Sequence, residues 1–171
     1  SRVLSGAGST LLIALGTIII GGGAGIIIGA ATGYFGGWFD EALMRINDAV
    51  AAFPSVLLAL VIISIAGTGK YKVMIALGIA FIPSFARVVR GEYMRIREAD
   101  YVISAKLIGV KTPRILFVHI LPNILPALLS AIAIGFNNAV LAEAGLSYLG
   151  IGVQPPDASL GRMLLESQTY L

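Results

Sequence analysis

The sequence predicts an all-α protein that crosses a membrane several times, and three observations lead to this prediction. Hydrophobic residues make up 57% of the 171 residues, charged residues make up only 12%, and the mean hydropathy is +0.92. A soluble domain usually carries about 25% charged residues. The apolar residues also lie in long runs, and a helix needs about 20 of them to cross a bilayer core. The absence of Cys excludes a disulfide framework.

Four largely apolar stretches predict four membrane-spanning helices, over residues 9–33, 41–66, 71–90 and 115–142. We expect Asp40 to cap the second helix, because an Asp side chain can accept hydrogen bonds from the free N–H groups of a first turn. Pro54 and Pro83 fall inside the second and third stretches. A proline at such a place either kinks the helix within the packed bundle or provides a hinge.

The distribution of basic residues predicts the orientation, because cytoplasmic loops carry an excess of Lys and Arg. If the loop 91–114 is cytoplasmic, eight of the 12 basic residues lie on that side and four on the other. The segment 143–171 is then extracytoplasmic. The chain starts at Ser1 rather than Met and ends without a further span, so we expect a fragment of a longer protein, with one transmembrane domain over 1–171.

Glycine recurs at every fourth position of the first predicted helix, at Gly21, Gly25, Gly29 and Gly33. Such spacing makes a groove without side chains, into which another helix can pack closely. We expect this face to serve assembly. The alternative is the general enrichment of glycine in membrane helices.

Residues for catalysis, metal binding or nucleotide binding are missing. The chain has one His, and Gly67-Thr68-Gly69-Lys70 lacks the first Gly and the final Ser/Thr of a phosphate-binding loop. Its basic residues flank membrane spans, which gives nucleic-acid binding no support. We therefore expect no enzyme activity, no metal and no cofactor bound by this chain.

Few polar residues fall within or beside the predicted spans, and such residues are candidates for a translocation path. The candidates are Asn137, Asn138 and Glu143. Hydrogen bonding between helices is the alternative for the two Asn residues, and a solvated place in the external loop is the alternative for Glu143.

The loop 91–114 is too long for a tight turn and predicts a short helix of its own. Asp100 can cap a helix over 101–108, and Gly109 can end it in a left-handed conformation. Ile103 and Leu107 would lie on one face of that helix. An exposed apolar face needs a partner protein or, alternatively, the bilayer surface.

The same loop resembles the EAA loop of ABC-importer permeases. The run Tyr101-Val102-Ile103-Ser104-Ala105-Lys106-Leu107-Ile108-Gly109 is followed, after nine residues, by His119-Ile120-Leu121-Pro122. Further matching runs are Gly33-Tyr34-Phe35-Gly36-Gly37, Ala52-Phe53-Pro54-Ser55, Arg87-Val88-Val89-Arg90-Gly91, Ala142-Glu143-Ala144-Gly145-Leu146-Ser147-Tyr148-Leu149-Gly150 and Gly152-Val153-Gln154-Pro155-Pro156. Together they are similar to the second permease subunit of dipeptide, oligopeptide and nickel importers.

This resemblance implies a type I, MetI-like helical core in a bacterial or archaeal inner membrane, with one more helix before this region and one after it. Two such permeases would form the path for peptides or nickel, and an extracytoplasmic binding protein would deliver the cargo. ATP and Mg²⁺ would bind to a separate cytoplasmic ATPase. By resemblance, the residues that contact this ATPase are Glu98, Asp100, Tyr101, Ile103, Ser104, Ala105, Lys106, Leu107, Gly109, Leu121 and Pro122.

One departure concerns the Glu-Ala-Ala that names the motif, which is Ile103-Ser104-Ala105 here. The acidic position is lost, and Glu98 and Asp100 are the candidates to replace it. Two other classes of protein stay as alternatives: a secondary transporter, which would need charged residues within the spans, and a structural membrane scaffold, which would not explain the ordered loop.

Overall fold

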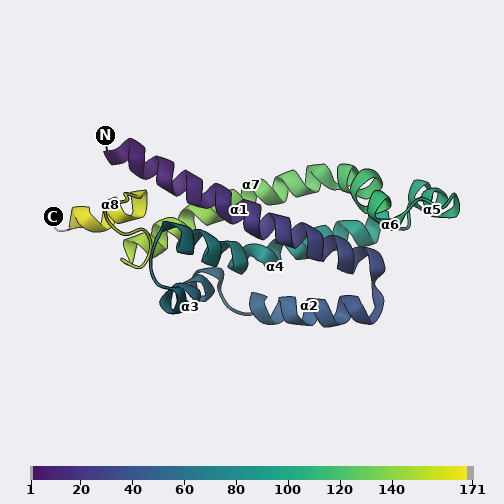
Figure 1. Cartoon of the computed structure of the whole chain (residues 1–171), viewed down its shortest axis with the longest axis horizontal. Helices are drawn as coiled ribbons and strands as arrows, with labels where there is room; N and C mark the ends of the chain where they lie inside the picture. The colour runs from purple at the N-terminus through teal and green to yellow at the C-terminus, as the bar shows by residue number, and fades with distance from the viewer. Residues whose placement is uncertain (1, 169–171) are drawn as a thin grey trace.

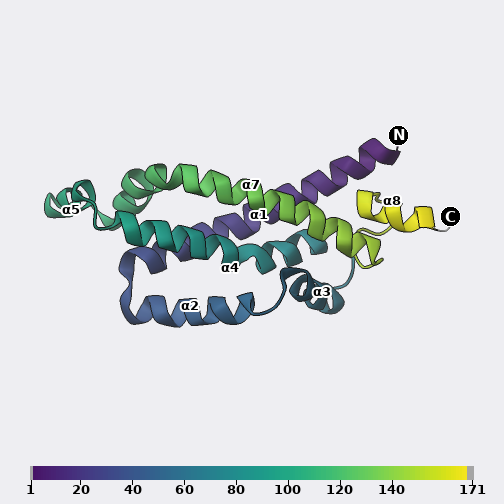
Figure 2. The same cartoon turned by 180° about the vertical axis from the view of Figure 1, so that it is seen from behind.

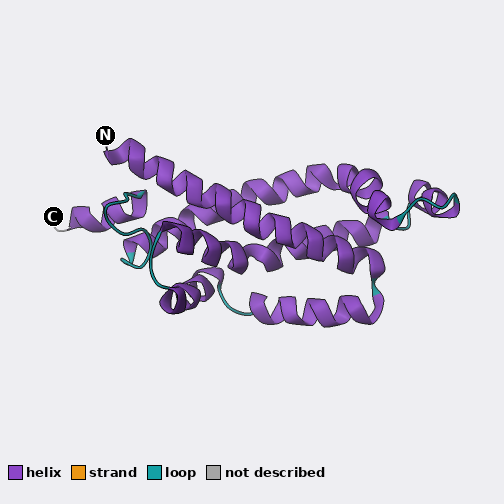
Figure 3. Ribbon diagram, viewed as in Figure 1, coloured by secondary structure: helices purple, strands orange, loops and turns teal. Residues whose placement is uncertain are grey.

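The computed structural model describes residues 2–168, and within this range the chain forms helices and loops but no strands (Figure 3). The helices are α1 (Arg2–Phe35), α2 (Gly37–Ala51), α3 (Ser55–Ala66), α4 (Lys70–Ile96), α5 (Asp100–Leu107), α6 (Thr112–Arg114), the π-helical turn η1 (Ile115–Ile120), α7 (Leu121–Tyr148) and α8 (Leu160–Ser167). Three long helices, α1, α4 and α7, form an elongated bundle (Figures 1 and 2). The described chain begins and ends at one end of this bundle, and α5 lies beyond the other end (Figure 1).

Three helical stretches are long and apolar enough to cross a membrane: α1, α4 and the continuous stretch Thr112–Tyr148. All three are longer than the predicted spans, and α1 covers residues 2–35 rather than 9–33. Helix α4 includes the first six residues of the predicted loop 91–114, and α7 includes the first six of the predicted external segment 143–171. The last three residues of that segment, 169–171, lie outside the described residues.

The second predicted span, 41–66, is wrong as a single helix. Only together are α2 and α3 long and apolar enough to cross a membrane. The two helices are bent by 85° at the break between them. Pro54 precedes α3 with φ −54° and ψ 131°, so the chain leaves the helical conformation before it re-enters it. Asp40 does not cap α2 either, because the helix starts at Gly37 and contains Asp40 in its first turn.

The glycine face of α1 packs against α4. A Cβ atom at Gly29 would lie 2.6 Å from the backbone oxygen of Ala86, and one at Gly33 would lie 2.6 Å from that of Arg90. Gly21 and Gly25 face α4 in the same way, whereas Gly23 has no atom within 4 Å of its Cβ position. The partner of this face is therefore a helix of the same chain. The glycine face thus packs two helices within the chain, which corrects the expectation that it serves assembly.

Two clusters of buried apolar side chains hold the bundle together. One joins α1, α3, α4 and α7 and includes Ile13, Ile63, Leu77, Phe85 and Leu146. The other lies toward α5 and includes Val89, Tyr93, Val102, Ile115 and Ile120. Helix α8 folds back onto α1, where the Leu160 N–H donates to Thr10 Oγ1 at 3.3 Å.

Candidate functional site

Helix α5 has one face in the bundle and one face outside it. Val102 and Ala105 point inward and belong to the same buried cluster as Ile115. On the opposite side Leu107 is 82% exposed, and Ile108, which directly follows the helix, is 80% exposed. Val102 and Ala105 are three residues apart, which is close to one helical turn of 3.6 residues, so both lie on the inner face. The residues between them therefore lie on other sides of the helix.

Most residues predicted to contact an ATPase lie on the exposed side of this region. These are Glu98, Asp100, Tyr101, Ile103, Ser104, Lys106, Leu107, Gly109 and Pro122, while Leu121 is half-buried. Ala105 is different, because it is only 5% exposed and packs into the cluster of its own chain. A direct contact between Ala105 and a partner is therefore wrong for this structure.

The two ends of α5 differ in how well they follow the prediction. Gly109 has φ +82°, which is the left-handed conformation expected for the residue that ends the helix. At the other end Ala99 occupies the cap position and makes no side-chain cap bond. Asp100 is the first helical residue, so its predicted capping role is wrong. Its carboxylate still lies where the helix dipole favours negative charge.

Three contacts attach the α5 region to the bundle. The Tyr93 hydroxyl donates to the backbone oxygen of Leu116 at 2.8 Å in a buried place. Arg97 Nη1 donates to the backbone oxygen of Gly33 at 3.2 Å, and Lys106 Nζ lies 4.8 Å from the centre of the Tyr34 ring. The loop is thus held to α1, and the two elements that flank it, α4 and η1, are held to each other. The sequence analysis did not identify these contacts.

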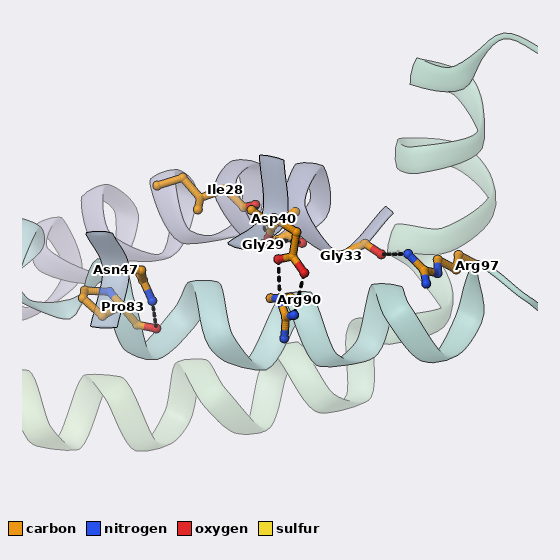
Figure 4. A network of polar contacts seen from close by, with 9 residues as sticks. Ile28, Gly29, Gly33, Asp40, Asn47, Pro83, Arg90 and Arg97 are labelled. Carbon is orange, nitrogen blue, oxygen red and sulfur yellow. Dashed lines mark hydrogen bonds and ion pairs between the residues drawn. The ribbon is translucent and has the colours of Figure 1, made fainter. Parts of the chain in front are cut away.

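A polar seam between α2 and α4 was also missed (Figure 4). Arg90 Nε and Nη2 donate to the two carboxylate oxygens of Asp40, each at 2.6 Å. About two turns further along α2, Asn47 Nδ2 donates to the backbone oxygen of Pro83 at 3.4 Å. The spacing of Asp40 and Asn47, seven residues apart on one face of a helix, is the signal that could have indicated this seam.

A cleft opens between α3, α4 and α7. It has two adjoining parts of about 150 Å³ and about 330 Å³, and both parts include Phe81, Ser84 and Asn138. The larger part extends to Ser55 at the start of α3. Asn138 therefore lines a cleft, as a path residue would, and its neighbour Asn137 is exposed but lines neither part. Ser55 and Ser84 were missed because serine is common in membrane helices and their spacing carries no signal.

Glu143 lies inside the bundle rather than in a solvated loop. Its side chain is fully buried, and Oε1 accepts a hydrogen bond of 2.6 Å from Ser147 Oγ. Ser147 Oγ in turn accepts from the Val153 N–H at 3.1 Å. Oε2 has no hydrogen-bond partner among the described residues. Because the side chain is buried, the prediction of a solvated place in the external loop is wrong. Glu143 also does not line the cleft, so the structure does not bring it together with Asn138.

The described part of the chain also holds no group of three or more His, Cys, Asp and Glu residues that could bind a metal ion. The candidate functional features are the outer face of α5 and the cleft.

Comparison with known proteins gives consistent matches. Residues 25–171 match the family of binding-protein-dependent transport system inner membrane components. The chain is 44% identical over 170 residues to a putative peptide transport system permease protein of Brucella suis, covering 99% of this chain and 57% of that protein. It is 40% identical over 147 residues to the dipeptide transport system permease protein DppC of Alkalihalophilus pseudofirmus, covering 86% of this chain and 48% of that protein.

A third relative is the glutathione transport system permease protein GsiD of Escherichia coli, which is 38% identical over 168 residues, or 98% of this chain and 55% of that protein. The chain thus spans about half the length of the curated relatives it matches. Among solved structures, the MetNI methionine ABC transporter in an inward-facing conformation matches with a TM-score of 0.71 and 18% identity, over 95% of this chain and 76% of that one.

The structural match confirms the all-α, MetI-like fold expected from the sequence. The relatives confirm the resemblance to permeases of peptide importers. On these grounds the chain belongs to the family of binding-protein-dependent transport system inner membrane components.

Proposed function

We propose that this chain belongs to a permease subunit in an ATP-driven importer of peptides or nickel, and that α5 couples it to a separate ATPase. The observation that carries this proposal is the outer face of α5. Leu107 and Ile108 are almost fully exposed there, although the other face of the same helix is firmly packed. Exposed apolar side chains on an ordered helix are typical of a protein interface.

The place of α5 favours a protein partner over the bilayer surface. Helix α5 lies beyond the ends of the long helices, in the direction of their axes (Figures 1 and 2). A helix that rests on a bilayer lies in the plane of the headgroups, whereas α5 projects past the ends of the long helices. Its outer residues are therefore placed to meet a protein in the aqueous phase.

The attachments of α5 provide a route for motion. An ATPase that closes on ATP would push the outer face, and the buried contact of Val102 and Ala105 with the cluster around Ile115 would pass the displacement to η1. The hydrogen bond from Tyr93 to Leu116 would then couple η1 to α4. A π-helical turn often marks a functional site within a long helix, and η1 lies between α5 and α7. The partners that this mechanism needs are a second permease, the ATPase with its ATP and Mg²⁺, and an extracytoplasmic binding protein.

Family membership favours this function over the two alternatives considered from the sequence. A binding-protein-dependent system is unlike a secondary transporter, which takes its energy from a coupled ion. A scaffold would not need a projecting helix with an unpartnered face. The cargo, peptide or nickel, and the bacterial or archaeal inner membrane follow from the resemblance.

The coupling proposal is tested by Leu107→Asp in the full-length subunit, reconstituted with its partner permease, ATPase and binding protein. A charge at this position would be buried in the contact without a partner. We expect the ATPase to dissociate during purification, and uptake to fall at least about tenfold. The matched control is Leu164→Asp, because Leu164 is an exposed residue on α8 and should leave the ATPase bound. Normal retention and uptake in Leu107→Asp would contradict the proposal.

The proposed orientation has a separate test. Single cysteines introduced as Lys106→Cys, in α5, and Asp157→Cys, shortly before α8, should react with a membrane-impermeant maleimide from opposite sides of sealed vesicles, because α5 and α8 lie at opposite ends of the bundle (Figure 1). The first should label only from the cytoplasmic side. Labelling of both from the outside would reverse the orientation without affecting the fold.

A further inference from the structure

Two groups of polar side chains in the bundle differ in their hydrogen bonds. Ser64 Oγ donates to the backbone oxygen of Leu60 at 2.8 Å, and Ser130 Oγ donates to that of Pro126 at 3.0 Å. Such bonds within one helix allow a hydroxyl group to face an apolar environment at little cost. These serines need no partner from elsewhere.

The second group has no such internal bonds. The side chains of Ser55, Ser84 and Asn138 make no hydrogen bond with the described part of the chain. They come from three helices, α3, α4 and α7, and all three line the larger part of the cleft. A polar group without a partner in a membrane costs free energy, so their gathering at one place indicates that they meet a solute or water there.

The geometry of the backbone explains why the cleft is open. Ser55 is the first residue of α3 and follows directly on the 85° break between α2 and α3. Ser84 lies near the middle of α4, next to Pro83. The apolar walls are formed by Val56, Phe81 and Leu141, and no charged side chain lines the cleft.

We infer that Ser84 and Asn138, together with Ser55, form a hydrogen-bonding station for amide groups of the cargo, on the path of the proposed importer. A carboxamide and a hydroxyl group both donate and accept hydrogen bonds, as an amide group does with its N–H and C=O. A bare metal ion would find neither carboxylate nor imidazole in this lining. The inference rests on the proposed function and adds which residues the cargo touches.

Because its lining holds no charged side chain, the cleft is suited to let the cargo pass rather than to bind it tightly. A hydrogen bond between uncharged groups contributes little net free energy, and a transport site must bind weakly enough to release its solute. Amide groups are common to all peptides, so a station that recognises them tolerates different side chains. Selection among peptides would then rest with the binding protein.

The test uses the full-length importer in proteoliposomes, with its binding protein and with radiolabelled alanine dipeptide, alanine pentapeptide or nickel as probes. Asn138→Leu removes the carboxamide at nearly constant size, and Ser84→Ala removes the hydroxyl group. We expect either variant to lower peptide uptake per ATP hydrolysed about three- to tenfold, while stimulation of the ATPase by loaded binding protein stays unchanged. The matched controls are Asn137→Leu and Ser130→Ala, which should alter the ratio less than twofold.

A binding readout completes the test. Asn138→Cys, with any other cysteine replaced, should react with a small maleimide, and alanine pentapeptide delivered during ATP turnover should slow this reaction. Asn137→Cys should show no such protection.

Three outcomes would overturn the inference. They are unchanged peptide uptake in Asn138→Leu, equal effects of Asn138→Leu and Asn137→Leu, and loss of the second permease from purified Asn138→Leu complexes. The last result would identify the cluster as a subunit interface. Failure of the wild-type importer to take up either peptide or nickel with ATP would instead count against the proposed function itself.

Discussion

The glycine face of α1 and the outer face of α5 were both predicted from spacing, but their surroundings differ. The glycine face is closed, because the backbone of α4 lies against it at Gly29 and Gly33. The outer face of α5 is open, and Leu107 and Ile108 contact little of the chain. Spacing therefore reveals that a face needs a partner, whereas only the tertiary structure shows whether the same chain supplies it.

The chemical nature of the two faces explains the difference. A groove of glycines can be filled only by a backbone that approaches closely and at a fixed angle, which favours a neighbouring helix that folds in the same bundle. A few large apolar side chains on a short helix bury area against any matching pocket. Such a face can bind a separate protein after this chain has folded.

The largest expected effect comes from filling the closed face. Gly29→Leu places carbon atoms where Val89 and the backbone of Ala86 already lie, so α1 and α4 must separate. We expect a loss of more than about 3 kcal/mol in the free energy of unfolding in detergent micelles. Gly23→Leu is the control, because nothing lies within 4 Å of its Cβ position. Equal stability of the two variants would show that the glycine face is only compositional.

A second comparison separates the two faces of α5 itself. Ala105→Asp puts a carboxylate into the cluster that contains Val102 and Ile115, and we expect it to lower the free energy of unfolding by about 3 kcal/mol. Leu107→Asp should leave that free energy unchanged, because its side chain is exposed. Thermal unfolding of the isolated full-length subunit measures both. If Ala105→Asp is stable but loses the ATPase, Ala105 contacts the partner after all.

The smallest effect concerns the seam that closes α2 onto α4. Asp40→Asn removes the charge that pairs with Arg90 in a largely buried place, and we expect a loss of about 2 kcal/mol. Asp48→Asn breaks the pair with Arg87, in which both side chains are 62% exposed, and should cost less than about 1 kcal/mol. Chemical denaturation in micelles should resolve the difference. Equal losses would mean that the buried pair contributes no more stability than the exposed pair.

Local patterns were sufficient for several features of the fold and the site. Long apolar runs predicted α1, α4 and α7, because a membrane helix satisfies its own backbone and needs only apolar side chains. Gly109 was predicted to end α5 because glycine adopts a positive φ without strain. The exposed positions of Ile103 and Leu107 followed from helical periodicity.

What the sequence by itself determined is therefore what depends on neighbours a few residues away: membrane helices, the end of α5, the existence of the glycine groove and the family motifs. The tertiary structure alone decided the features that join distant residues. From the sequence, Pro54 was expected to give a kink or a hinge within one span, and the fold instead breaks the helix there with a bend of 85°. Asp40 pairs with Arg90, 50 residues away, instead of capping its own helix. Glu143 is buried by the packing of α7. Such choices depend on the free energy of contacts between helices, and no local pattern contains that quantity.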